Sequence, residues 1–157
     1  MNLRVNKNNL GHSESKISFG SMVITKSYVT PLSYDIVGCA IAVHKELGPG
    51  LLESVYKKCL IHELKLNGFD VKSQVIVPVN YRNMEIDGQL KLDILVNEQV
   101  IVELKAVEAI HPVYEAQLIS YMKLLQVPQG LLINFFTKNI KTSMKPYVNE
   151  FFKALPE

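Results

Sequence analysis

Two acids and a lysine on neighbouring strand-like segments have the residue types and spacing needed to bind a metal ion and act on a phosphate. Asp93 lies in LKLDILV, residues 90–96, and Glu103 and Lys105 lie two positions apart in VIVELKAV, residues 100–107. Both segments are rich in aliphatic and β-branched residues, which is typical of strands. Residues two positions apart on a strand point to the same face, so Glu103 and Lys105 are expected to act together.

A tight hairpin would bring the two acids together. Only the residues NEQ separate Val96 from Val100, a common length for a hairpin loop, although the loop lacks glycine. Pairing of Val96 with Val100 places Asp93 directly opposite Glu103, with Cβ atoms about 4.5 to 5.5 Å apart. The charged residues of both segments, Lys91 included, then share one face. The even positions form the opposite, core-facing side, and all of them are aliphatic: Leu92, Ile94, Val96, Val100, Val102 and Leu104.

Two opposed carboxylates repel one another at neutral pH unless a positive group lies between them. A divalent cation meets this need, because Mg²⁺, or Mn²⁺ in its place, binds carboxylate and phosphate oxygens, at about 2.0 to 2.1 Å for Mg²⁺. Lys105 could orient or deprotonate an attacking water, or neutralise charge that develops on a phosphate. The alternative is an ordinary charged face on a solvated strand, where lysine also discourages aggregation at a sheet edge.

A third acid could join this pair from a helix. The segment 51–67 has a helical period, and Glu53 lies in its first turn at the margin of the apolar arc. From there its carboxylate could reach over a sheet that the helix packs against and add a third metal ligand. The alternative is that Glu53 only interacts favourably with the helix dipole. Glu63 lies roughly 15 Å farther along the helix, so it cannot serve the same cation and is expected to be structural.

The helix expected over residues 113–125 carries a polar residue on its apolar side. Gln117 falls there, between Leu124 and Tyr121. Burying an amide without partners costs on the order of 1 to 3 kcal/mol, so Gln117 is expected to have a dedicated hydrogen-bond partner. Tyr121, one turn later, faces the same way. The alternative is that the Gln117 amide forms hydrogen bonds with backbone groups at the edge of a strand.

The spacing of apolar and turn residues predicts one domain, residues 31–157, preceded by a flexible arm of polar composition, residues 1–30. Short turns between consecutive strands imply an antiparallel meander, and the crossover through the third helix favours a parallel return. The prediction is an α/β (α+β) fold of order α-α-β-β-β-α-β, with a mixed four-stranded sheet flanked by helices. Helices are expected over 33–47, with Ser33 as N-cap, and over 51–67, 113–125 and roughly 147–155; strands are expected over 71–81, 90–96, 100–107 and 129–136.

The bulk composition names no partner. The chain has 157 residues and a formal net charge of +2, which is too small to indicate a strongly basic nucleic-acid-binding surface. No secretory signal is recognisable, and Cys39 and Cys59 lie in apolar helical contexts, so we expect reduced cysteines and a cytoplasmic protein. No apolar run approaches the roughly 18 to 20 residues that a membrane span needs, so no membrane is expected as a partner.

A longer pattern surrounds these residues. The motif Gly50-Leu51-Leu52-Glu53-Ser54-Val55-Tyr56 lies within HKELGPGLLESVY and is followed by KLDILV, VIVELKAV, EAQLISYMKL and GLLINF. In these five ordered blocks the chain, from about residue 34 to residue 136, resembles the GxxExxY protein family, which is assigned to the PD-(D/E)XK nuclease superfamily. The resemblance implies a restriction-endonuclease-like core, in which a helix packs on a mixed four-stranded sheet and metal-binding acids converge at one end.

The resemblance also implies roles for individual residues. They are the helix acid Glu53, the superfamily aspartate Asp93, the (D/E)-x-K residues Glu103 and Lys105, and the Q-x-x-x-Y residues Gln117 and Tyr121, with Tyr56 as an auxiliary residue of the naming motif. The chain departs from the superfamily pattern in one respect: Lys91 and Leu92 precede the aspartate, so the proline of that pattern is missing.

Residues and resemblance together predict a Mg²⁺-dependent nuclease that hydrolyses phosphodiester bonds, with DNA as the favoured substrate. Lys138, Lys141 and Lys145 could contact the nucleic-acid backbone, or equally could form an ordinary solvated face. The alternative function is a non-catalytic nucleic-acid- or protein-binding module that retains the nuclease fold. A homodimer formed through an edge strand or the N-terminal arm is left open.

Overall fold

The computed structural model describes residues 22–88 and 90–157, which form a mixed sheet flanked by helices, as predicted. The sheet has five strands rather than four, in the order β1-β4-β5-β6-β7. Neighbouring strands are antiparallel except β5 and β6, which are parallel and are joined through a helix. The strands are β1 (Val71–Ile76), β4 (Lys91–Val96), β5 (Val100–Lys105), β6 (Gln129–Asn134) and β7 (Met144–Val148).

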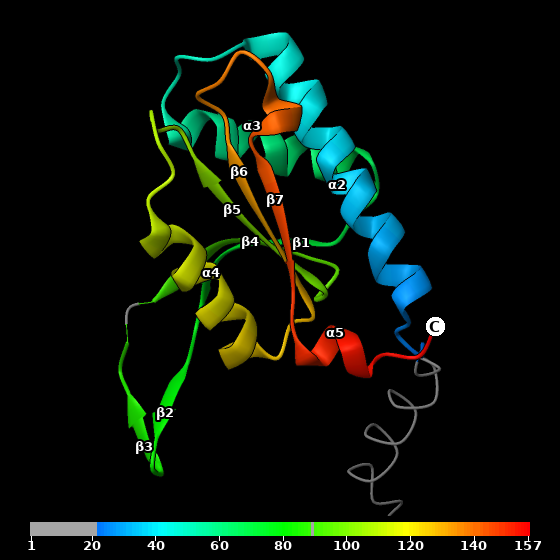
Figure 1. The fold of residues 1–157 in the computed structure, drawn as a ribbon, viewed down its shortest axis with the longest axis vertical. Coiled ribbons are helices and arrows are strands. Elements are labelled where there is room, and N and C mark those ends of the chain that lie inside the picture. Colours follow the sequence, from blue (N-terminus) through cyan, green and yellow to red (C-terminus); the bar gives the residue numbers. More distant parts are fainter. Residues whose placement is uncertain (1–21, 89) are drawn as a thin grey trace, which may run out of the picture.

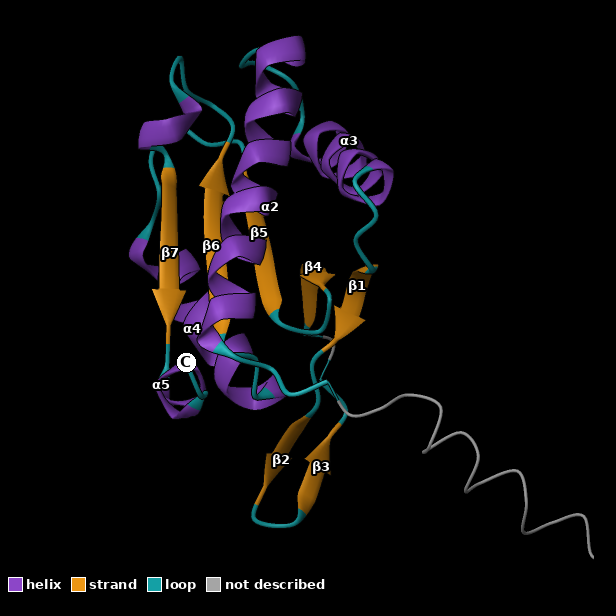
Figure 2. Ribbon diagram, turned by 90° about the vertical axis from the view of Figure 1, so that its right-hand side faces the viewer, coloured by secondary structure: helices purple, strands orange, loops and turns teal. Residues whose placement is uncertain are grey.

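Helices cover both faces of this sheet (Figures 1 and 2). Helices α2 (Lys26–Leu47) and α3 (Glu53–Leu66) pack on one face, and α4 (Pro112–Leu125) packs on the other. The short helix α5 (Glu150–Ala154) and the 3-10 turn η1 (Ile140–Thr142) complete the described elements. Strands β4 and β5, which carry the acids, therefore lie between α3 on one side and α4 on the other.

Helix α2 begins seven residues before the predicted start. Thr25 caps the helix by accepting a hydrogen bond from the Tyr28 amide at 3.1 Å, and Val29 and Leu32 extend the buried apolar stripe toward the N-terminus. Ser33, the predicted N-cap, is buried inside the helix. The predicted arm thus overlaps this helix over residues 26–30, and residues 1–21 lie outside the described part of the chain.

Two prolines account for the other differences between the predicted and the observed strands. The predicted strand 71–81 stops at Ile76, because Pro78 cannot donate a ladder hydrogen bond, and the chain continues into a separate hairpin of β2 (Val79–Tyr81) and β3 (Met84–Ile86). This hairpin projects from the body of the molecule (Figure 2). Pro146 lies in the edge strand β7, where a missing donor is tolerated. The predicted terminal helix is accordingly shorter and begins at Glu150.

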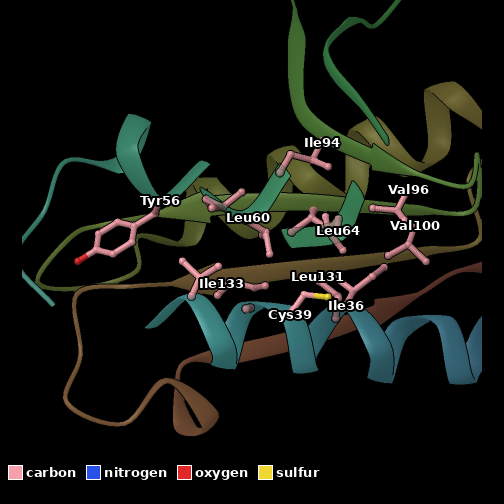
Figure 3. Packing of buried hydrophobic residues seen from close by; sticks show 14 of the residues in the cluster. Ile36, Cys39, Tyr56, Leu60, Leu64, Ile94, Val96, Val100, Leu131 and Ile133 are labelled. Carbon is pink, nitrogen blue, oxygen red and sulfur yellow. The ribbon is translucent and has the colours of Figure 1, made fainter. Parts of the chain in front are cut away.

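Two apolar cores hold the layers together. The core between the sheet and helices α2 and α3 includes Ile36, Leu60, Leu64 and Val100, all buried (Figure 3). The second core joins the sheet to α4, and its buried residues include Leu118. Cys39 is buried and Cys59 is half-buried, and both are free thiols, in agreement with the prediction of reduced cysteines. Among the described residues, no helix combines the length and apolar character that crossing a membrane requires.

Close packing of α4 on β6 leaves no space for a side chain at Gly130. A Cβ atom there would lie 2.7 Å from Met122 Sδ and 2.9 Å from Leu118 Cδ1. Both atoms lie near the ends of flexible side chains that can shift, so Gly130→Ala is expected to lower the free energy of unfolding by about 1 to 3 kcal/mol, measured by urea denaturation. Gly38→Ala is the control, since a Cβ on α2 meets no atom within 4 Å, and it should be neutral or stabilising. Equal losses in both variants would contradict this packing.

Candidate functional site

The hairpin of β4 and β5 has the predicted register. Val96 pairs with Val100 and Ile94 with Val102, and the Gln99 amide donates to the Val96 carbonyl at 3.0 Å. The two turn residues that follow Val96, Asn97 and Glu98, have φ angles of 49° and 58°. Left-handed conformations at both positions are those of a type I′ turn, which matches the twist of the strands even though glycine is absent.

Beyond the Ile94–Val102 pair, the regular ladder is replaced by hydrogen bonds that backbone amides donate to the side chains of the two acids. The Asp93 amide donates to Glu103 Oε1 at 3.0 Å, and the Leu104 amide donates to Asp93 Oδ2 at 3.1 Å. Asp93 is 9% exposed and Glu103 is 5% exposed. The two carboxylates are therefore brought together and buried, and the alternative of an ordinary solvated face does not describe them.

The interrupted ladder also changes the expected alternation. Leu92 was expected on the same core face as Ile94, but it packs with Leu95 in the core beneath α4. The prediction for Leu92 is wrong because strict alternation assumes a continuous ladder, and the ladder is replaced by side-chain hydrogen bonds at Asp93.

The electrostatics of the pair depend mainly on burial. Burial raises the pKa of the Glu103 carboxyl to about 8, and the negative charge of Asp93 acts in the same direction. The charge of Lys105 opposes this shift and lowers the pKa. On α4, burial and the Glu103 charge likewise raise the pKa of Tyr121. A buried carboxyl with a raised pKa beside a second carboxyl forms a site in which an added cation would gain favourable interactions.

Lys105 is held by an aromatic ring rather than by either acid. Its Nζ lies 4.6 Å from the centre of the Tyr114 ring, a cation–π contact from α4. The chain just after Lys105 is fixed by the buried Asn134 side chain, which donates to the Val107 carbonyl at 2.8 Å and accepts from its amide at 3.1 Å. Neither Tyr114 nor Asn134 was predicted to have a role; the signal for Asn134 is an amide at the end of an otherwise aliphatic strand.

Glu53 is the first residue of α3 and is half-buried. Within residues 22–88 and 90–157, no group of three or more acidic, histidine or cysteine side chains has an arrangement that could hold a metal ion. The structure thus brings Asp93 and Glu103 together but does not assemble Glu53 with them. The α3 residue that reaches the pair is Lys57, whose Nζ lies 2.5 Å from Asp93 Oδ1. Sequence reasoning missed Lys57, although it lies one helical turn after Glu53 and so on the same helix face.

Tyr56 fixes the loop that leads into α3. Its hydroxyl donates to the Gly48 carbonyl at 2.5 Å and accepts from the Leu51 amide at 3.1 Å. The ring is buried and stacks on Phe135, with ring centroids 4.6 Å apart (Figure 3 shows the placement of Tyr56). Since Leu52 provides no side-chain cap, these hydrogen bonds are what tie the start of the helix to the core, and they position Glu53.

Tyr56→Phe is therefore expected to lower the free energy of unfolding by about 1 to 2 kcal/mol, because the Gly48 carbonyl and the Leu51 amide lose their shared partner. Urea denaturation measures this change. Tyr34→Phe is the matched control, since Tyr34 is 73% exposed and its substitution should have almost no effect. A Tyr56→Phe variant as stable as the parent protein would show that the loop is held by other contacts.

Gln117 and Tyr121 form a hydrogen-bonded pair on α4, with 2.7 Å between Gln117 Nε2 and the Tyr121 hydroxyl oxygen. Tyr121 is buried, but Gln117 is exposed, so the prediction that Gln117 is buried is wrong. Its position at the margin of the helix face leaves the amide accessible to solvent. The expected dedicated partner does exist, and it is the tyrosine rather than a backbone edge.

The three C-terminal lysines are all exposed. Lys145 lies on β7 opposite Leu132, which itself pairs with Glu103, and its Nζ lies 2.7 Å from Glu115 Oε1. A cavity of about 150 Å³ adjoins it, lined in part by Asn134, Thr142, Ser143 and Lys145. Lys138 and Lys141 lie on the segment between β6 and β7. Lys145 is thus the member of the three that the sheet register places nearest to the acids.

Comparison with known proteins agrees with this geometry. A family model described as PD-(D/E)XK nuclease superfamily matches residues 30–147, a range that contains both acids, Lys105 and α4. No curated protein and no solved structure matched significantly. The match covers most of the chain and includes the mixed sheet whose central hairpin carries the buried acids. On these grounds the chain belongs to the PD-(D/E)XK nuclease superfamily.

Proposed function

We propose that the protein is a metal-dependent nuclease that hydrolyses phosphodiester bonds. The observation that carries this proposal is the buried, closely spaced pair of Asp93 and Glu103 with Lys105 beside it. Burying two carboxylates close together lowers the stability of the folded protein unless a cation offsets their charge. Such a pair in a member of a nuclease superfamily therefore supports a cation site. Carboxylate oxygens are the ligands that Mg²⁺ and Mn²⁺ prefer, which fits this donor set.

In this proposal Asp93 and Glu103 hold the metal. Glu53, which the structure does not bring to the pair, is the candidate for a further ligand from α3. The bound ion supplies Lewis acidity and lowers the pKa of a water molecule. Lys105, held against Tyr114, orients that water or neutralises charge that develops on the phosphate. The Gln117–Tyr121 pair lies on the helix that covers the acids and helps to set the polar environment of Glu103.

The proposed substrate is nucleic acid, with DNA favoured, and the protein is proposed to be a cytoplasmic member of the GxxExxY family. Lys145, next to a cavity lined in part by Leu132, which pairs with Glu103, is the best placed of the three lysines to contact a neighbouring phosphate. Lys138 and Lys141, on the segment between β6 and β7, are proposed to contact further phosphates of the same nucleic acid. A homodimer would supply a second active site for cleavage of the other strand of a duplex.

The test is a cleavage assay on single- and double-stranded DNA and RNA with Mg²⁺, Mn²⁺ or EDTA. The parent protein should cleave only with metal, and Asp93→Ala and Lys105→Ala should each reduce the rate by about 100-fold or more. Activity that never appears with any substrate, or that persists undiminished in both variants, would overturn the nuclease proposal.

One observation favours the second candidate, a binding module that retains the fold without cleavage. Lys57 already neutralises Asp93 in the absence of metal, so the pair does not depend entirely on a divalent cation for compensation. The same assay separates the candidates if binding is measured in parallel. Tight, metal-independent binding of nucleic acid without cleavage would identify the binding module.

A further inference from the structure

Lys57 forms an ion pair within the proposed metal site. Its Nζ lies 2.5 Å from Asp93 Oδ1, and the other oxygen, Oδ2, accepts the Leu104 amide at 3.1 Å. The Lys57 side chain is 19% exposed and that of Asp93 is 12% exposed. Both carboxylate oxygens therefore have donors already, and the ammonium lies beside the one that makes no backbone contact.

The placement of Lys57 follows from the way α3 is fixed. Leu60 and Leu64 bury the helix in the core, and Tyr56 ties its start to the preceding loop. Lys57 is one turn after Glu53 on the same helix face, so the proposed third ligand and the ammonium approach the acids from the same side. Lys105 is not an alternative partner for Asp93, because its Nζ stacks on the Tyr114 ring.

We propose that Lys57 is an internal counter-ion that a divalent cation must displace from Asp93, and that it thereby weakens metal binding. This inference rests on the proposed function. A metal ion bound at Oδ1, at about 2.0 to 2.1 Å, would compete with the ammonium for the same oxygen, and the two cations would repel one another. The displaced ammonium becomes available for a substrate phosphate, so Lys57 links the binding of metal to the binding of nucleic acid.

The first experiment measures Mn²⁺ binding to the full chain by electron paramagnetic resonance and isothermal titration calorimetry. Lys57→Met keeps most of the side-chain volume but removes the charge, and it should bind Mn²⁺ roughly threefold to tenfold more tightly than the parent protein. Lys58→Met is the matched control, because Lys58 is exposed and lines the groove between α2 and α3, away from Asp93. Its affinity for Mn²⁺ should be unchanged.

The outcomes separate this inference from the proposed function. If the parent protein binds Mn²⁺ and Lys57→Met binds it equally or more weakly, Lys57 is not a displaced counter-ion, and the nuclease proposal stands. If neither protein binds Mn²⁺, both are overturned. Binding by Lys57→Met alone would support the counter-ion role. Circular dichroism checks the fold, and Lys57→Gln replaces Lys57→Met if the latter is unfolded.

A second measurement needs no substitution. Acetylation of the lysines, followed by mass spectrometry, reports how accessible each ammonium is in the parent protein. Saturating Mg²⁺ should raise the labelling rate of Lys57 severalfold, because the ion pair with Asp93 is broken, while Lys58 serves as the internal reference. A labelling rate of Lys57 that Mg²⁺ leaves unchanged or lowers would overturn the inference.

Discussion

Replacement of Glu103 by Gln is expected to abolish metal-dependent cleavage, with a loss on the order of 1000-fold in rate. The amide oxygen can still accept the hydrogen bond that the Asp93 amide donates to Glu103 Oε1, so the hairpin geometry should be preserved. What disappears is the negative charge that would hold the cation. The loss should therefore appear as absent Mn²⁺ binding and absent cleavage in a protein with the circular dichroism spectrum of the parent.

Glu108→Gln is the matched control for this prediction. Glu108 follows on the same segment but is exposed, and its substitution should leave cleavage and Mn²⁺ affinity within about twofold of the parent values. A Glu103→Gln variant that retains metal-dependent activity would show that Asp93 and Glu53 suffice to bind the ion. The proposed role of Glu103 would then be wrong.

The stability of the metal-free protein is expected to fall by a few kcal/mol as the pH rises from about 5 to about 8. The folded protein raises the pKa of Glu103 from 4.5 to about 8, so the folded state binds more protons than the unfolded state within that range. The contribution of the protonated carboxyl to stability is fully present below the unfolded pKa and is lost as the pH rises through the folded pKa. Urea denaturation in EDTA at a series of pH values measures the decline.

Two comparisons assign the decline to this carboxyl. Glu103→Gln should be more stable than the parent protein at pH 8 and should show a flatter pH dependence, because its side chain never ionises. Saturating Mg²⁺ should restore much of the stability of the parent at pH 8, since a ligand that binds only the folded state stabilises it. Parallel pH profiles for the parent and the variant would refute the assignment.

The register of the central hairpin could be predicted because its determinants are local. The aliphatic alternation and the short connection between Val96 and Val100 favour the pairing of these two residues, and the structure has that pairing from Val96–Val100 to Ile94–Val102. The superfamily assignment was equally accessible, since its motifs are short blocks in a fixed order. Neither required knowledge of how the helices pack.

Features that depend on tertiary packing were not predictable in the same way. The environment of the acids depends on how two helices pack against the strands: Lys57 of α3 contacts Asp93, and the charge of Glu103 acts on Tyr121 of α4. Whether Glu53 or Lys57 reaches Asp93 depends on the rotation and height of α3 above the strands, which a helical period does not determine. Strand β7 was not predicted from the sequence; it contains Pro146, which is tolerated because β7 lies at the edge of the sheet.

The β2–β3 hairpin leaves the main sheet between β1 and β4 and forms a sheet of its own. Its base is closed where the Val77 amide donates to the Leu90 carbonyl at 2.8 Å. Because β2 and β3 share no ladder with the five-stranded sheet, insertions or deletions at the tip, near Arg82 and Asn83, leave the pairing of β1 with β4 in place. The length and sequence of this hairpin can therefore change during evolution without altering the site at Asp93.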